Sequence, residues 1–306
     1  GKTNLQAMDD ALDQDYLRRK LRQACLMQSH RNVADVTYQQ GLLPQALAFI
    51  ETSQLAALPE IGVYFHAYRF LQDPAAHQHF LTFQTLLPQL PATLPGEELR
   101  DLYLLGINFC IRRTNQGDWE MAREALRLYR KGLTNGALLE NGWLSPFTYR
   151  NAVALSLKIK DFTWAQDFIE RYAVALPPTQ REELLSYNRA RLAYAKGDPE
   201  GALEALRYVR SNDVLFTLTM DTFRAKIYYE TDAYDLLTAH LDKMHTYLRR
   251  KGDSYHHKNY TNFIAFLRKI LHLRPRPAEQ EHLQEQIKQK AILTERQWLL
   301  EKLAEA

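Results

Sequence analysis

The stretch SYNRARLAYAKGDPEGALEALRYV, residues 186–209, decides the fold. It predicts two short helices joined by a Gly-Asp turn. Gly197 suits the end of the first helix, because glycine adopts a positive φ without steric cost. Asp198 can cap the next helix, and Pro199 fits its first turn, where a missing N–H is not needed. The apolar stripe of this second helix consists of Ala202, Leu203, Leu206 and Val209.

The same spacing of small and large apolar residues recurs around other turns. Relative to Gly197, a small residue lies seven positions before and five positions after, and a larger apolar residue lies nine positions after. Small residues there let two helices cross closely, and the larger residue fills the groove between them. The other fitting turns are Gly41 (with Ala34, Ala46 and Ile50), Gly117 (with Cys110, Ala122 and Leu126) and Lys160 (with Val153, Ala165 and Ile169). We call this pattern the turn template.

The spacing of these turns predicts a repeat protein. They fall at positions 41, 117, 160 and 197, so the last two intervals are 43 and 37 residues and the first is 76, close to two units. A less regular helix pair over residues 62–87 fills the long interval, and a fifth turn follows at Thr231–Asp232. Paired helices with such periods are typical of an α-solenoid.

At these residues the chain resembles the tetratricopeptide repeat. It has Gly-Asp-x-x-x-Ala, a small residue seven positions earlier, and a proline that ends the unit at Pro177. The resemblance covers about residues 32–241, in units longer than the ~34 residues of that family. It implies an all-α fold, a right-handed α-solenoid of antiparallel helix pairs, and a binding scaffold rather than one activity. Residues 139–151 and 259–271 are also similar to uncharacterised proteins of the Bacteroidota, which implies no activity.

The predicted organisation is a repeat domain over residues 1–277 and a C-terminal segment over 278–306. The segment 87–96 is the clearest break, because its three prolines oppose a helix. We expect residues 278–306 to form one long charged helix that caps the stack or docks to another subunit or domain. The predicted units lie near 28–58, 61–90, 98–135, 147–177, 181–212, 215–250 and 254–273.

Composition narrows the class of protein. The formal net charge is +3, without the clustered basicity of most nucleic-acid binders. Two cysteines in 306 residues do not form a disulfide framework, which predicts a reducing, cytoplasmic location. No apolar run is long enough to span a membrane. The chain begins Gly1-Lys2-Thr3 without an initiator methionine, so a regulatory or structural arm of a larger enzyme or signalling protein is an alternative.

Asparagine occurs nine residues before each of the four turns, at Asn32, Asn108, Asn151 and Asn188. Asparagine is disfavoured inside helices because its side chain competes for backbone hydrogen bonds, so the shared register indicates a role. In the tetratricopeptide family the matching position faces a concave groove. There an amide can donate to and accept from a peptide backbone. The resemblance therefore implies an asparagine ladder, with Asn151 and Asn188 as its leading members.

Arginine and tyrosine lie beside these asparagines. Arginine can bind a carboxylate through two hydrogen bonds, and tyrosine adds apolar contact area, so we expect an extended peptide with an acidic group. In the alternative, the asparagines bond helix to helix inside the stack and the arginines pair with nearby glutamates. The predicted groove residues are Asn32, Asn108, Arg150, Asn151, Tyr187, Asn188, Arg191 and Tyr194.

Two surface features have two interpretations each. Residues 18–22 form a basic face of the first helix, which is either solvated or a patch for phosphate or an acidic partner. Trp143 lies in a break between helices, where it either plugs the core or makes an exposed contact.

Basic residues at Arg249–Lys251 and at Arg274 and Arg276 leave a nucleic-acid-binding solenoid as a further alternative.

The sequence predicts no catalytic or metal site and no cofactor. His77 and His79 are two residues apart, and His240 and His245 are five apart, unlike the spacing of a helical metal pair. No zinc-protease motif, nucleophile elbow or glycine-rich dinucleotide loop occurs. We therefore expect a non-enzymatic scaffold for a protein or peptide partner, with no membrane contact, and its oligomeric state is left open.

Overall fold

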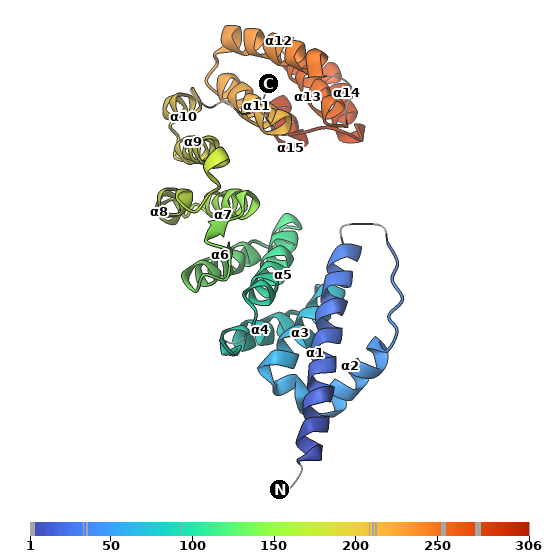
Figure 1. Cartoon of the computed structure of the whole chain (residues 1–306). Coiled ribbons are helices and arrows are strands. Elements are labelled where there is room, and N and C mark those ends of the chain that lie inside the picture. Colours follow the sequence, from blue (N-terminus) through green and yellow to red (C-terminus); the bar gives the residue numbers. More distant parts are fainter. Residues whose placement is uncertain are drawn as a thin grey trace. The chain divides into compact units, whose positions relative to one another are not determined.

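The computed structural model describes residues 4–32, 34, 36–92, 94–207, 209, 211, 213–251, 255–272 and 277–305. Helices form nearly all of the regular structure in this part of the chain (Figure 1). The all-α prediction is therefore confirmed. The chain divides into two compact units, Gly1–Gln180 and Arg181–Ala306, which we call unit 1 and unit 2.

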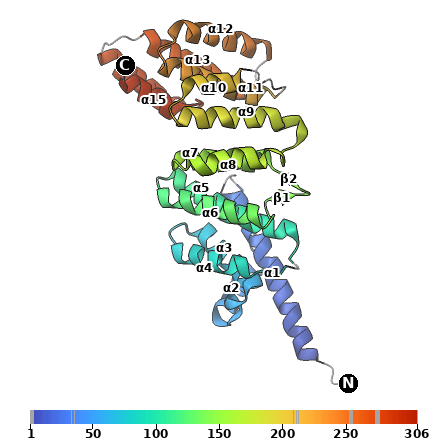
Figure 2. The same cartoon turned by 90° about the vertical axis from the view of Figure 1, so that its left-hand side faces the viewer.

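Unit 1 contains eight helices and one small hairpin among its described residues. The helices pack in neighbouring pairs, and Figure 2 shows α5 beside α6 and α7 beside α8. The elements are α1 (Leu5–Arg31), α2 (Leu43–Thr52), α3 (Pro59–Gln72), α4 (His77–Leu86), α5 (Gly96–Asn115), α6 (Trp119–Thr134), β1 (Leu139–Glu140), β2 (Trp143–Leu144), α7 (Pro146–Lys158) and α8 (Phe162–Ala173), with single 3-10 turns at Leu55–Ala57 and Leu87–Gln89.

Unit 2 follows from α9, which begins at the end of unit 1. Its helices are α9 (Pro178–Ala195), α10 (Pro199–Leu206), α11 (Val214–Glu230), α12 (Tyr234–Lys251), α13 (Tyr255–His272), α14 (Pro277–Gln289) and α15 (Arg296–Glu305). None of the helices in the described part of the chain combines the length and apolar character that crossing a membrane requires.

The C-terminal segment corrects one prediction. Residues 278–306 do not form one long helix, because the chain turns between α14 and α15, where Glu295 has a φ of 55°. Ile287 of α14 and Leu299 of α15 are both fully buried in one core with α11, α12 and α13. A single straight helix could not bring both segments to that core, so the burial of their apolar residues explains the turn.

The turn template is present in the structure. Gly41, Gly117, Lys160, Gly197 and Asp232 have φ values of 54°, 100°, 60°, 83° and 56°. Lys160 is informative, because a side chain normally avoids this left-handed region. The residues that the template places between helices are buried: Ala46, Ala122, Ala165 and Ala202; Ile50, Leu126, Ile169 and Leu206; and Cys110, Val153 and Ala190.

The first predicted unit, residues 28–58, differs from the template. Residues 36–40 are not helical, and α1 ends before them at Arg31. Val36 and Thr37 are β-branched and have a low helix propensity. Ala34 therefore lies outside any helix, and α1 packs mainly against α3.

A buried carboxylate holds α1 to its neighbours. Glu98 of α5 accepts hydrogen bonds from Arg18 Nη1 at 2.8 Å and from the Tyr64 hydroxyl at 3.0 Å, and Arg22 Nη1 lies 3.4 Å from its second oxygen. Burial and the nearby Glu98 charge raise the pKa of Tyr64, which keeps the phenol protonated. Arg18 and Arg22, two residues of the predicted basic face, are therefore engaged in ion pairs within unit 1.

Candidate functional site

A groove of about 930 Å³ opens on unit 1 beside the hairpin. This volume lies in the range of protein ligand sites. We call it the hairpin groove. Its lining comes from α5 (Arg100, Asp101, Leu104 and Asn108), from Tyr129 and Leu138, from the hairpin and its flank (Glu140, Asn141, Trp143, Leu144 and Ser145), from the start of α7 (Pro146, Phe147, Thr148 and Asn151), and from Pro177 and Pro178.

The hairpin that forms one wall has a local sequence cause. Asn141 and Gly142 form its turn with φ values of 51° and 83°. Two positive φ values are those of a two-residue turn that matches the twist of the strands, for which Asn-Gly is the preferred sequence. Leu139 pairs with Leu144, and Glu140 pairs with Trp143. The sequence prediction of a simple break between helices misses this hairpin, although Asn-Gly between apolar residues is its signal.

Two contacts fix the hairpin in place. Arg100 Nη1 of α5 lies 2.9 Å from Glu140 Oε2, which joins β1 to α5. The backbone N–H of Leu144 donates to the carbonyl of Ala175 at 2.7 Å. Because the hairpin is held at both strands, the groove wall has a defined position within unit 1.

The two residues of β2 point in opposite directions, as successive residues of a strand do. Leu144 is fully buried, whereas Trp143 is 43 % exposed. Leu144 therefore fills the core. Trp143 is exposed, which agrees with its interpretation as an exposed contact residue and not with its interpretation as a plug over the core. Phe147, on the first turn of α7, is 70 % exposed, with the Arg150 guanidinium 5.1 Å from its ring centre. The groove thus has two accessible aromatic rings at its edge.

Two members of the predicted asparagine ladder meet in this groove. Asn108 of α5 and Asn151 of α7 both line it, and both are exposed. Their amides are therefore accessible to a bound molecule, and each can donate and accept hydrogen bonds. Arg150 lies next to Asn151 on α7 and is half-buried.

Asn32 lies elsewhere in unit 1. It is the C-terminal cap of α1, and its side-chain nitrogen lies 3.4 Å from the carbonyl of Leu71. It does not line the hairpin groove. The structure therefore does not continue the ladder from Asn108 to Asn32.

The predicted site residues of unit 2 lie in packed surroundings. Asn188 is 0 % exposed, and its amide donates to the Leu184 carbonyl at 2.8 Å, within its own helix. Arg191 Nη1 lies 3.4 Å from the Asn188 amide oxygen. The rings of Tyr187 and Tyr194 contact Phe223 of α11, with centroid distances of 6.2 and 5.2 Å. Asn188 therefore lies in the interior, as the alternative interpretation expects, but its amide donates within α9 rather than to another helix.

The charged groups of the hairpin groove are paired. Arg100 is bound to Glu140, and Asp101 Oδ2 lies 3.3 Å from Arg22 Nη2. Arg150, which the sequence predicts to bind an acidic group, is not among the residues that line this groove.

Several titratable groups outside the hairpin groove are buried or half-buried, and burial shifts their pKa values. His66 Nδ1 lies 2.7 Å from His79 Nδ1, and burial, together with the His79 charge, lowers the pKa of His66 to about 4. Burial also raises the pKa of the Cys25 and Cys110 thiols, which keeps them protonated and unreactive. Among the described residues, no group of three or more His, Cys, Asp or Glu side chains is arranged to hold a metal ion.

Basic residues proposed for nucleic acid are described only in part. Arg249 and Arg250 are exposed at the end of α12. Arg274 and Arg276 lie outside the described residues, as do Gly1, Lys2 and Thr3.

No protein-family model, no curated protein and no solved structure matches this chain. The likeness to the tetratricopeptide repeat therefore rests on the residues of the turn template alone.

Proposed function

We propose that this protein is a non-enzymatic helical-repeat scaffold that binds an extended segment of a protein or peptide partner in the hairpin groove. The observation that carries the proposal is the meeting of Asn108 and Asn151, two exposed amides at one register, in a groove whose edge carries the exposed rings of Trp143 and Phe147.

The chemistry of the groove indicates how such a segment is recognised. The amides of Asn108 and Asn151 can pair with backbone N–H and C=O groups of an extended chain, independently of its sequence. Trp143 and Phe147 offer apolar area for one or two side chains of that segment. Because Arg100 and Asp101 are already paired, we infer that the bound segment is apolar or uncharged rather than acidic.

Selection from a random peptide library displayed on phage tests this proposal. We expect the chain to enrich extended peptides with aromatic or aliphatic residues. Trp143→Ala should weaken the binding of a selected peptide by roughly 30-fold, since a buried aromatic contact contributes about 2 kcal/mol. Trp119→Ala is the matched control, because Trp119 is also an exposed tryptophan of unit 1 but does not line the groove.

Two results would contradict the proposal. One is a library selection that enriches no peptide above an unrelated helical protein. The other is a selected peptide that binds the Trp143→Ala and Trp119→Ala variants equally well, which would place its site outside the hairpin groove.

A further inference from the structure

The two groove amides differ from the other asparagines at the same register. Among the described residues, the amides of Asn32 and Asn188 form hydrogen bonds, whereas those of Asn108 and Asn151 are exposed and have no hydrogen-bond partner. Both can therefore pair with backbone groups of a bound chain. The rest of the groove indicates which backbone conformation that chain has.

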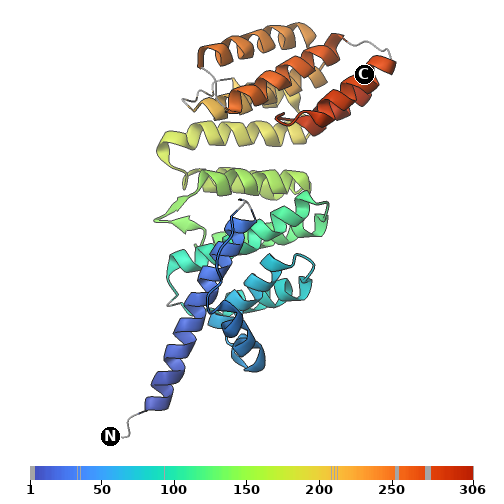
Figure 3. The same ribbon diagram turned by 90° about the vertical axis from the view of Figure 1, so that its right-hand side faces the viewer.

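The hairpin offers no open edge to a bound β-strand. Figure 3 shows its two short strands at one end of the helices of unit 1. The backbone N–H groups of Leu139 and Leu144 donate outside the hairpin, to the carbonyls of Gly136 at 3.0 Å and Ala175 at 2.7 Å. Because Leu139 and Leu144 pair in register, these are the N–H groups that face away from the partner strand. A strand added at either edge needs them, so it would have to break one of these hydrogen bonds.

Two other classes of peptide ligand also match the groove poorly. A helix satisfies its own backbone groups, so it would leave the amides of Asn108 and Asn151 without backbone partners. Phosphorylated or acidic motifs are recognised by clusters of arginines. Among the described residues that line the groove, Arg100 is the one arginine, and it is bound to Glu140. The groove therefore favours a ligand whose backbone groups are free and whose recognition does not depend on negative charge.

A polyproline II helix has these properties. It is extended, and its backbone groups are free because it has no internal hydrogen bonds. Proline has no backbone N–H, so a proline-rich segment offers mainly carbonyl acceptors. The groove offers donors to match them, namely the amide nitrogens of Asn108 and Asn151 and the indole N–H of Trp143, which can only donate.

The two accessible rings of the groove suit the side chains of such a segment. Trp143 is 43 % exposed and Phe147 is 70 % exposed. The Arg150 guanidinium, 5.1 Å from the centre of the Phe147 ring, is within cation–π distance and supports that ring. A polyproline II helix has three residues per turn, so prolines three positions apart lie on one side of it. Grooves lined by aromatic rings bind segments with this spacing.

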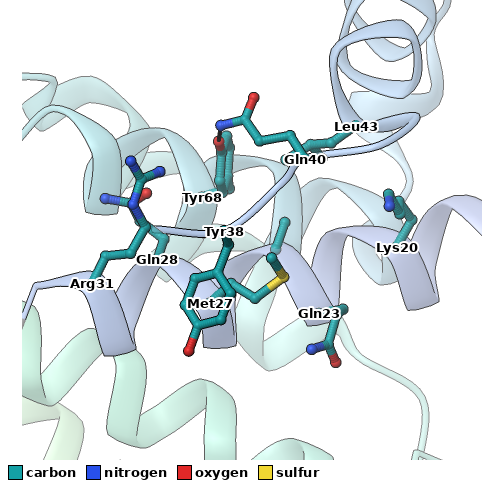
Figure 4. A pocket seen from close by; sticks show the side chains of 10 residues that line it. Lys20, Gln23, Met27, Gln28, Arg31, Tyr38, Gln40, Leu43 and Tyr68 are labelled. Carbon is teal, nitrogen blue, oxygen red and sulfur yellow. Dashed lines mark hydrogen bonds between the residues drawn. The ribbon is translucent and has the colours of Figure 1, made fainter. Parts of the chain in front are cut away.

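Aromatic rings beside another hollow of unit 1 are not available in this way. Figure 4 shows Tyr38 and Tyr68 among the residues that line a hollow beside α1. Tyr68 is only 2 % exposed, and the hollow has a volume of about 20 Å³, which is room for about one water molecule. A proline ring does not fit there, whereas the hairpin groove of about 930 Å³ combines accessible rings with sufficient room.

Given the peptide binding proposed for the hairpin groove, on which this step rests, we infer that its ligand is a proline-rich segment of a partner protein in the polyproline II conformation. Two prolines separated by two residues pack on Trp143 and Phe147. Carbonyl groups of the segment accept hydrogen bonds from Asn108 and Asn151. Because a proline-rich segment has this conformation before it binds, it loses little conformational entropy on binding.

Fluorescence anisotropy with a labelled peptide of ten L-prolines tests the inference on the whole chain. We expect saturable binding with a Kd below about 1 mM. The matched control is the same peptide made of D-prolines, which has the same composition and the opposite helical hand. It should bind at least about tenfold more weakly.

Variants of the chain place the binding in the groove. Trp143→Ala should weaken binding of the L-proline peptide by about tenfold or more, whereas Trp119→Ala, outside the groove, should leave it unchanged. Because Trp143 is partly exposed, the circular dichroism spectrum should stay that of wild type. Phe147→Ala is a second variant with the same expected loss, at a position that is more exposed still.

The peptide-library selection separates failure of this inference from failure of the proposed function. We expect the selected peptides to carry prolines three positions apart and to compete with the L-proline peptide. Selected peptides that lose affinity for Trp143→Ala but are not enriched in proline would overturn the inference and leave the peptide-binding groove standing. A selection that enriches no peptide would contradict both.

Three results of the anisotropy experiment would also overturn the inference. One is the absence of L-proline peptide binding up to about 1 mM. Another is equal binding of the two mirror-image peptides, because a polyproline II site distinguishes their helical hands. The third is equal affinity of the Trp143→Ala and Trp119→Ala variants for the L-proline peptide.

Discussion

Asn151 and Asn188 occupy the same position of the turn template and have opposite surroundings. Each precedes its turn residue by nine positions, and each lies on the first helix of its pair. Asn151 in unit 1 is exposed in the hairpin groove, whereas Asn188 in unit 2 is fully buried. The template therefore determines where the asparagine lies on its helix but not what covers it.

The difference comes from the elements next to each helix. In unit 2, Phe216 and Phe223 of α11 pack against Tyr187, and Phe223 also packs against Tyr194, so aromatic rings close over that side of α9. In unit 1, the hairpin precedes α7 and forms a wall beside Asn151 instead of a cover. A repeated sequence position can thus be accessible in one unit and buried in another.

Removing each of the two amides tests this difference most directly. We expect Asn188→Ala to lower the free energy of unfolding by about 2–3 kcal/mol, because a buried hydrogen bond is lost and a cavity remains. Asn151→Ala should change it by less than about 0.5 kcal/mol, as exposed substitutions usually do. Urea denaturation measures both. Equal losses would mean that the two positions have the same environment.

Removing both groove amides together tests whether they bind a peptide. Asn108→Ala with Asn151→Ala should weaken a library-selected peptide by roughly 30-fold, since two hydrogen bonds contribute about 1 kcal/mol each. The thermal midpoint should stay within a degree or so of wild type. Asn32→Ala is the control, because Asn32 occupies the same register but does not line the groove. A similar loss of affinity for this variant would mean that Asn32 also belongs to the binding site.

Acid should act on unit 1 through the His66–His79 pair. His66 has a pKa of about 4 in the folded protein, against an ordinary value of 6.5. Because the folded pKa is the lower one, this contribution to stability is full above pH 6.5, declines as the pH falls toward 4, and is absent below it. Allowing for solvent screening of a half-buried group, we expect a loss of about 1.5 kcal/mol.

The control for this effect is a difference between variants. Wild type should lose more stability between pH 7 and pH 4.5 than His66→Gln does, as followed by urea denaturation at each pH. His77→Gln, on the same helix as His79 but exposed, should follow wild type. Parallel pH profiles for wild type and His66→Gln would exclude the pair as the acid-sensitive group.

The smallest effect concerns the turns themselves. Lys160 in unit 1 and Gly197 in unit 2 occupy one template position with φ values of 60° and 83°. Lys160→Gly should stabilise the chain by about 1 kcal/mol by removing the strain of a left-handed side chain, and Gly197→Ala should destabilise it by a similar amount. No atom within 4 Å would obstruct the added methyl group at Gly197, so φ alone decides the sign. Thermal midpoints that move in the same direction would show that other contacts dominate.

How much the sequence could predict depended on the range of the interaction. The turns at Gly117, Lys160 and Gly197 follow from local backbone preference, and the apolar template residues around them are buried as expected. The hairpin was missed although Asn141-Gly142 signalled it. The single C-terminal helix was wrong, because helix periodicity does not reveal that Ile287 and Leu299 must reach the same core.

The sequence by itself determined the helix pairs, their turns and the common register of the asparagines, because backbone conformation and the periodicity of apolar side chains depend on neighbours within about one helical turn or one hairpin. The tertiary structure alone decided which asparagine is accessible. Phe223, for example, packs against Tyr187 and Tyr194 on the helix that carries Asn188, although it is 35 positions from Asn188 in the chain. Contacts of that separation depend on how helices pack, and no local pattern encodes them.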